Sequence, residues 1–289
     1  MKTALLIADL EGIGGVDDPS MLIFGSPGHP EACAHMTREV RAAITGLLEA
    51  GYTRIKLSDA HRSGSGVPNL SLAELPEGVD LLYTDDMYGG PLLDGVDAVA
   101  CVGMHAAGGT QGFGAHTVEI HTAWYAGERA LSETDIAMAL AAERGIPTLY
   151  SAGDDVLGQS LNGRLHFVCT KQSRGPANTA SLELARIEES LRLAGHVLPR
   201  RPEPPPPPRL LLRFKGSDFA DAATEAGARR ISPSTVEIEG TTFSAAYQEA
   251  IRVASATSAL VVPYLEDVFG TSAFTASAVR FLTMPFPSR

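Results

Sequence analysis

Aromatic residues and cysteines are scarce in this 289-residue chain, and their scarcity excludes some classes of protein. Phe, Trp and Tyr make up 6% of the residues, too few to predict a base-stacking surface for single-stranded nucleic acid. The three cysteines, Cys33, Cys101 and Cys169, form no CxxC pair. We therefore expect no disulfide framework and a reducing compartment.

Basic residues and long apolar runs are also few. The 23 Lys and Arg residues face 34 Asp and Glu residues, which gives a net charge of −11 and argues against nucleic acids and anionic membranes as partners. No apolar run approaches the roughly 20 residues that a membrane span needs. The apolar start before Asp9 is too short for the core of a signal peptide. We expect a soluble, cytoplasmic protein.

The chain does have an alternation of strand-like and helix-like segments. Apolar, β-rich runs predict strands at 3–10, 54–59, 79–83, 96–104 and 147–153, and periodic segments predict helices at 29–52, 132–145 and 178–195. Ser132 and Asp135 have the spacing of a capping box at the start of one helix. This rhythm predicts an α/β fold, with a mostly parallel sheet flanked by helices.

A proline-rich segment divides the chain. Residues 204–208 are five consecutive prolines, which cannot continue a helix or a central strand. We predict an α/β catalytic domain over 1–198, a stiff proline-rich connection over 199–208 and a smaller α+β section over 209–289.

Acids and histidines fall where predicted strands end. Asp9 and Glu11 follow the first strand, Asp59 and His61 the second, and His105 a third. The carboxyl ends of parallel strands open on one edge of the sheet, so these side chains are expected in one crevice. The D-x-E spacing places Asp9 and Glu11 on one face of an extended strand. Carboxylates and imidazoles suit Zn²⁺, and also Mn²⁺ or Co²⁺, and a pair of cations relieves the repulsion between the two acids.

Each of these residues has a plainer alternative role. Asp9 and Glu11 can cap the glycine-rich turn that follows them. A lone His61 is typical of a surface turn, and a lone His105 of a hydrogen-bonded, half-buried histidine. Glu133 follows the predicted N-cap Ser132, so the helix dipole explains it as well as a metal does. The residues alone leave Glu133 open between these roles.

A glycine-rich loop after His105 contains His116. Such loops commonly close over substrate, and a histidine there that binds no metal can shuttle a proton or stabilise an oxyanion. Glu11 is the second candidate for a proton acceptor. The alternating segment TVEIHTAWY predicts a strand that begins at Thr117. His121 lies in this segment, where a structural role is the better interpretation.

Six segments together resemble the DppA family of D-aminopeptidases. They are ADLEGIGG at 8–15, SDAH at 58–61, GMHA at 103–106, GAHT at 114–117, LSETDIAMALAAERGIPTLYSAGDD from 131, and TKQSRGPA at 170–177. The resemblance covers roughly residues 3 to 180. It implies a dinuclear zinc aminopeptidase, with two Zn²⁺ per subunit, acting on small peptides with an N-terminal D-residue such as D-Ala-D-Ala.

The resemblance also implies roles for particular residues. The family's metal ligands match Asp9, Glu11, His61, His105 and Glu133, and its catalytic histidine matches His116. The family forms closed homo-oligomeric rings such as a decamer, so a homo-oligomer is expected.

Two other classes stay open on the sequence. One is a different dinuclear metallohydrolase, such as a phosphoesterase, with Lys171 and Arg174 as a basic clamp for phosphate. The other is a non-enzymatic α/β binding module whose acids and histidines only satisfy turns.

Overall fold

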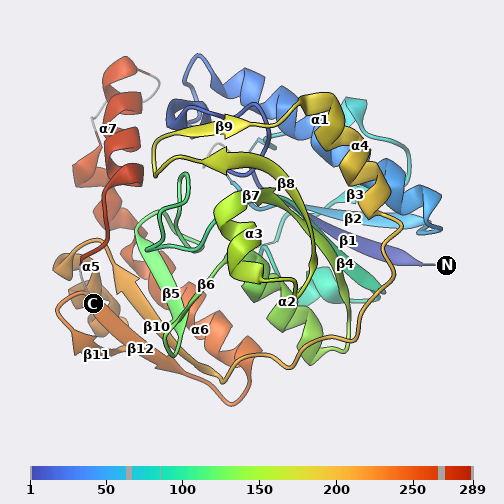
Figure 1. The fold of residues 1–289 in the computed structure, drawn as a ribbon. Coiled ribbons are helices and arrows are strands. Elements are labelled where there is room, and N and C mark those ends of the chain that lie inside the picture. The colour runs from blue at the N-terminus through green and yellow to red at the C-terminus, as the bar shows by residue number, and fades with distance from the viewer. Residues whose placement is uncertain (1, 63–66, 85, 266–270, 288–289) are drawn as a thin grey trace.

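Two sheets organise the chain in the computed structural model, which describes residues 2–62, 67–84, 86–265 and 271–287 (Figure 1). The larger sheet has the order β3-β2-β1-β4-β7-β8-β9. Its strands are β1 (Thr3–Ala8), β2 (Arg54–Asp59), β3 (Val79–Leu81), β4 (Ala98–Met104), β7 (Thr148–Asp154), β8 (His166–Ser173) and β9 (Thr179–Ser181). Every pairing in this sheet is parallel except that of β8 with β9, which confirms the predicted fold class.

The central strands of this sheet are buried on both faces. Successive side chains of β1 point to opposite faces, so Leu5 and Ile7 enter one core while Leu6 enters the other. On the Leu6 side lie α1 (His29–Glu49) and α4 (Leu184–Ala194), which pack against each other (Figure 1). On the other side lies α2 (Glu133–Glu143). The continuous apolar runs in the sequence are therefore those of strands covered on both faces.

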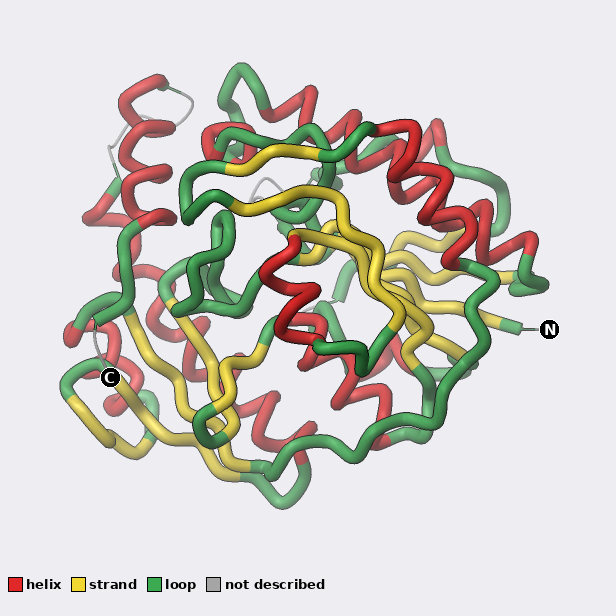
Figure 2. The backbone as a smooth tube through the Cα atoms, in the orientation of Figure 1, coloured by secondary structure: helices red, strands yellow, loops and turns green. Residues whose placement is uncertain are grey.

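The second sheet is antiparallel and has the order β11-β12-β10-β5-β6. Its strands are β5 (Thr122–Ala126), β6 (Arg129–Leu131), β10 (Arg209–Phe214), β11 (Arg229–Ser232) and β12 (Thr235–Glu239). Figure 2 shows the strands of the two sheets as separate yellow groups. The second sheet takes β5 and β6 from before the proline-rich segment and the other strands from after it. The proposed division at 199–208 stays a prediction.

The remaining helices are short or belong to the C-terminal part. They are α3 (Asp155–Leu161), α5 (Ser217–Glu225), α6 (Phe243–Thr257) and α7 (Ser272–Thr283), with 3₁₀ turns η1 (Pro19–Leu22), η2 (Leu72–Glu74), η3 (Gly90–Leu93) and η4 (Ser258–Tyr264). Within the described ranges, no helix combines the length and apolar character needed to cross a membrane.

Two predicted elements differ from the structure. The helix predicted at 178–195 begins only at Leu184, because residues 179–181 form β9 and pair with the end of β8. The strand expected from Thr117 begins at Thr122, because residues 117–121 form a tight loop. The side-chain periodicity therefore did not predict either boundary. Pairing with β8 decides the first one, and hydrogen bonds within the loop decide the second.

Candidate metal centre

The residues predicted to bind metal gather at the carboxyl edge of the parallel sheet. Asp9 and Glu11 follow β1, His61 follows β2, and His105 follows β4. Glu133 is the first residue of α2, and His116 lies in the loop between β4 and β5. Their ligand atoms form three overlapping groups, each within 4.8 Å, and these groups are Asp9–Glu11–His61, Asp9–His105–Glu133 and Glu11–His105–His116.

The two acids after β1 come together for a reason other than the predicted one. β1 ends at Ala8, so Asp9 and Glu11 lie in the following turn and the strand alternation does not orient them. The turn lies directly on the end of β4, where Gly12 N–H donates to Gly103 O at 2.7 Å. Gly103 has φ +72°, and a Cβ there would meet Asp9 O at 2.1 Å. Glycine is therefore required for this close approach.

The histidines lie directly beside the carboxylates. His61 Nδ1 is 3.0 Å from Glu11 Oε2. His105 Nε2 is 3.5 Å from Asp9 Oδ2 and 3.7 Å from Glu133 Oε1. His116 Nε2 is 3.8 Å from Glu133 Oε1, and its ring stacks on that of His105 with centroids 4.5 Å apart.

The other nitrogen of each imidazole ring lies against a backbone carbonyl. His61 Nε2 donates to Leu22 O at 3.0 Å, His105 Nδ1 to Ala106 O at 2.9 Å and His116 Nδ1 to Gly114 O at 2.8 Å. A carbonyl oxygen can only accept, so each of these ring nitrogens carries the proton. The remaining nitrogen of each ring faces the carboxylates, which is the orientation that a metal-ligating histidine needs.

Glu133 is held at both of its oxygens. The Tyr88 hydroxyl donates to Oε2, and Val118 N–H donates to Oε1 at 2.7 Å. The predicted capping box of Ser132 and Asp135 is present and fixes the start of α2 beside the cluster. The sequence did not predict Tyr88 and Val118 as partners of Glu133. They lie 45 and 15 positions away from it, and nothing in the local sequence pairs residues at those separations.

The protonation of the cluster reflects crowded negative charge. Burial, together with the charges of Glu11 and Glu133, raises the pKa of Asp9 well above its ordinary value. Burial alone would also raise the pKa of Glu133, but His105, His116 and the hydrogen bond from Tyr88 together outweigh burial and lower this pKa to about 2. Burial lowers the pKa of His105, yet the nearby acids Glu133, Glu11 and Asp154 together outweigh burial and raise this pKa to about 9. His105 thus gains a proton that balances part of the negative charge of the acids.

The donor set fits a divalent cation. Asp9 Oδ2 and His105 Nε2 are both buried, have no hydrogen-bond partner among the described residues, and face each other. Unpaired buried polar atoms cost free energy, and a cation between them satisfies both. Carboxylate oxygen with imidazole nitrogen, and no thiolate, is a donor set that zinc accepts.

A cavity of about 440 Å³ opens over the cluster. Asp9, Glu11, His61, His116 and Glu133 form part of its lining. The remaining wall is mostly apolar and comes largely from the loop around Val118 and from the C-terminal helices, with Ile251 of α6 and Ala278 and Leu282 of α7. The C-terminal part of the chain therefore completes the space in which a ligand meets the cluster.

Three residues considered on the sequence lie outside the cluster. Asp59 accepts hydrogen bonds from Asn69 N and Nδ2. His121 is buried, hydrogen-bonds Thr257 and stacks on Phe219, so its structural role is confirmed. Lys171 is fully buried, and its Nζ donates to Glu11 O and Val16 O. The suggested phosphate clamp is therefore wrong for Lys171, which instead fastens the turn after β1.

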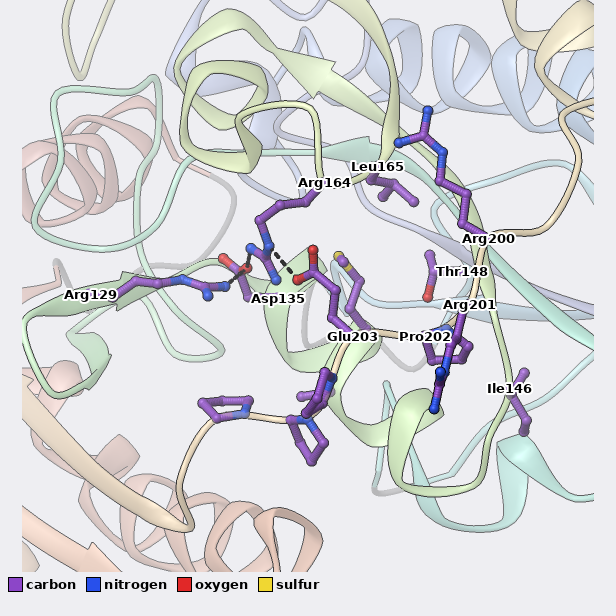
Figure 3. Close-up of a pocket in the computed structure, with 15 residues that line it drawn as sticks. Arg129, Asp135, Ile146, Thr148, Arg164, Leu165, Arg200, Arg201, Pro202 and Glu203 are labelled. Atoms are coloured by element: carbon purple, nitrogen blue, oxygen red, sulfur yellow. Dashed lines mark hydrogen bonds and ion pairs between the residues drawn. The ribbon is translucent and has the colours of Figure 1, made fainter.

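Figure 3 shows a second, smaller cavity of about 100 Å³. Among the described residues, none lines both cavities. In this cavity Asp135 pairs with Arg129 and Arg164, and Arg164 Nε also donates to Glu203 at 2.7 Å. Figure 3 shows Arg200 and Arg201 pointing away from this group. The ion pairs connect the proline-rich segment to the first turn of α2. We therefore interpret this cavity as a structural contact between the two segments.

A parallel sheet whose carboxyl edge gathers buried carboxylates and histidines defines the class of metal-binding α/β proteins. Within that class the chain belongs to the D-aminopeptidase family, whose family model matches residues 1–252.

One curated relative and one solved structure are similar to this chain. The D-aminopeptidase of Bacillus subtilis (strain 168) is 26% identical over 152 residues, which are 51% of this chain and 54% of that protein. The match thus spans about half the length of the curated relative. The solved structure of the Zn-dependent D-aminopeptidase DppA from Bacillus subtilis, described as a self-compartmentalizing protease, superposes with a TM-score of 0.76. It shares 21% identity, and the superposition covers 88% of this chain and 97% of that one, which shows a common fold.

Proposed function

We propose that the chain is a zinc-dependent aminopeptidase that removes an N-terminal D-residue from short peptides of the D-Ala-D-Ala type. Membership of the D-aminopeptidase family supports this proposal. The observation that carries it is the set of three histidines that each donate one ring N–H to a backbone carbonyl and turn the other nitrogen toward buried carboxylates.

We assign two zinc ions per subunit to five ligands: Asp9, Glu11, His61, His105 and Glu133. Asp9 belongs to two of the ligand groups and would therefore contribute to both parts of the site. When bound, zinc polarises a carbonyl and lowers the pKa of a water molecule toward neutrality. Mn²⁺ or Co²⁺ suits the same donors.

We assign His116 the proton transfer. Burial and the neighbouring His105 lower the pKa of His116, and its Nδ1 proton is engaged with Gly114 O. Its Nε2 therefore serves as an unprotonated base at the cavity that His116 lines. It can accept a proton from the attacking water and deliver it to the leaving amine of the peptide.

The assembly and location of the chain are also part of the proposal. The DppA structure is that of a self-compartmentalizing protease, and we propose that this chain likewise forms a closed homo-oligomer. Cys33, Cys101 and Cys169 form no disulfide with one another, in keeping with a cytoplasmic location. Light scattering of the purified protein tests the assembly, and a monomer would contradict it.

One experiment separates the proposal from its alternatives. Metal content is measured in the purified protein, followed by hydrolysis of D-alanyl and L-alanyl p-nitroanilide and of p-nitrophenyl phosphate. We expect about two zinc ions per chain and preference for the D-alanyl substrate. Preference for the phosphate ester would establish a phosphoesterase, and a metal-free protein inactive on all three would establish a binding module.

A further inference from the structure

One described acidic residue lines the cavity over the metal cluster without belonging to the cluster. Among the lining residues that the structure describes, the acids are Asp9, Glu11, Glu133 and Glu119. The first three occur in the groups of potential metal ligands, and Glu119 occurs in none of them. Its neighbours Val118 and Ile120 also line the cavity, so Glu119 places a carboxylate within a stretch of apolar wall.

The backbone around Glu119 is tightly constrained. Val118 has φ +68°, and Glu119 N–H donates to Thr117 O at 2.9 Å, which is the pattern of a rare, strained γ-turn. Left-handed backbone is especially unfavourable for a β-branched residue such as valine. Thr122 N–H donates to Glu119 O at 2.8 Å and closes the loop from the other side. Strain retained at an active-site loop indicates that the loop's position matters.

The Glu119 carboxylate has no charged partner within the described part of the protein. No ion pair between described residues involves it, and the residue is half-buried. Burial raises the pKa of Glu119, a hydrogen bond with Ser258 opposes the rise, and the charge of Glu133 adds to it. A half-buried carboxylate without a cation is unfavourable, and a positive group on a ligand in the cavity would relieve this.

An aminopeptidase substrate brings such a group. Its free N-terminus is a cation that must lie close to two divalent cations during hydrolysis. The ligand carboxylates are committed to the metal, so another negative charge is needed to offset this repulsion. The apolar surroundings of Glu119 strengthen its attraction for a cation relative to water.

We propose that Glu119 binds the N-terminal ammonium group of the peptide substrate. This inference rests on the proposed function and assigns the subsite that makes the enzyme an exopeptidase.

The test compares E119Q with E225Q, a variant of an exposed glutamate on α5, on paired substrates. D-alanyl p-nitroanilide carries the amine, and propionyl p-nitroanilide lacks it. We expect E119Q to raise KM about tenfold for the first, as the loss of one charge-assisted hydrogen bond predicts, with a smaller change in kcat. Hydrolysis of the second, zinc content and the E225Q variant should be unchanged. An unaltered KM would overturn the assignment.

A D-lysyl p-nitroanilide arm identifies the cation that Glu119 binds. If E119Q raises KM by the same factor for the D-lysyl and D-alanyl substrates, the result supports binding of the N-terminal ammonium group. If E119Q raises KM only for the D-lysyl substrate, Glu119 selects a basic side chain, and the proposal would be wrong.

The proposed function fails if the wild-type protein cleaves neither D- nor L-aminoacyl amides. A binding measurement tests the ammonium site even in that case. Calorimetry on the zinc-loaded protein compares D-alaninol, which carries the ammonium but no scissile bond, with propan-1-ol. We expect D-alaninol to bind more tightly, and E119Q to weaken its binding about tenfold. Equal binding to wild type and E119Q would refute the ammonium site.

Discussion

The Tyr88 hydroxyl donates a hydrogen bond to Oε2 of Glu133, so the loop after β3 orients the carboxylate that begins α2. Burial raises the pKa of Tyr88 well above its ordinary value, and the charge of Glu133 adds to this rise. Tyr88 is therefore a reliable donor at any working pH. It acts on the proposed metal site through Glu133.

Removing this hydroxyl tests how far the support of Glu133 matters. We expect Y88F to weaken zinc binding about 10- to 100-fold, the usual cost of losing an outer partner of a metal ligand. A competition titration with a coloured chelator measures the change. Y83F, at an exposed tyrosine, is the matched control. Equal zinc affinity of Y88F and wild type would show that Val118 N–H alone suffices to orient Glu133.

His116 should separate catalysis from metal binding. We expect H116A to retain its zinc and to lose about 100-fold or more in kcat, because proton transfer contributes at least this much. Elemental analysis and steady-state kinetics on D-alanyl p-nitroanilide give the two quantities. H196A removes an exposed histidine and should match wild type. Full activity in H116A would disprove the assigned role, and loss of zinc would make His116 a ligand.

Metal binding should stabilise the fold, because the cluster forms only when three chain segments and α2 meet. At a free zinc concentration about 100-fold above Kd, the added stability is about 2.7 kcal/mol. We expect Tm to rise with zinc concentration in wild type, and the rise to shrink strongly in D9N. D80N, at a surface acid paired with Arg54, should keep the full rise. Calorimetric melting after chelation and zinc titration provides the measurement.

Glu39 should make stability depend on pH. Its carboxyl is buried and accepts from Gly14 N at 2.7 Å, and burial raises its pKa from 4.5 to about 8. The raised pKa means that its stabilising contribution is complete below pH 4.5 and is lost as the pH rises through about 8. At about 1.4 kcal/mol per pKa unit, the loss has an upper bound of about 5 kcal/mol.

The isosteric variant E39Q removes this titration and keeps an oxygen to accept from Gly14. We expect the stability of E39Q relative to wild type to increase from pH 4.5 to about pH 8 and then to level off. Urea unfolding across this range measures the difference. E74Q, at an exposed glutamate, should give no such trend. A pH-independent difference would mean that Glu39 is ionised in the folded protein.

The sequence by itself determined the parallel sheet and most of the cluster. The run at residues 4–8 is apolar at every position, which is typical of a strand covered on both faces. Asp9 directly follows this strand, His105 directly follows β4, and His61 lies two residues beyond the end of β2. Local periodicity carries this information, because parallel strands expose their carboxyl ends on one edge. The resemblance to D-aminopeptidases implied the same three residues as metal ligands.

Only the tertiary structure decided the contacts between distant segments. It showed Tyr88 and Val118 holding Glu133, Lys171 buried beneath the turn that contains Glu11, and β5 paired with β10 in the second sheet. It also placed Glu119 in the cavity through a strained turn at Val118. These relationships depend on hydrogen bonds and packing between residues far apart in the chain or on an unusual backbone conformation, and side-chain periodicity records neither.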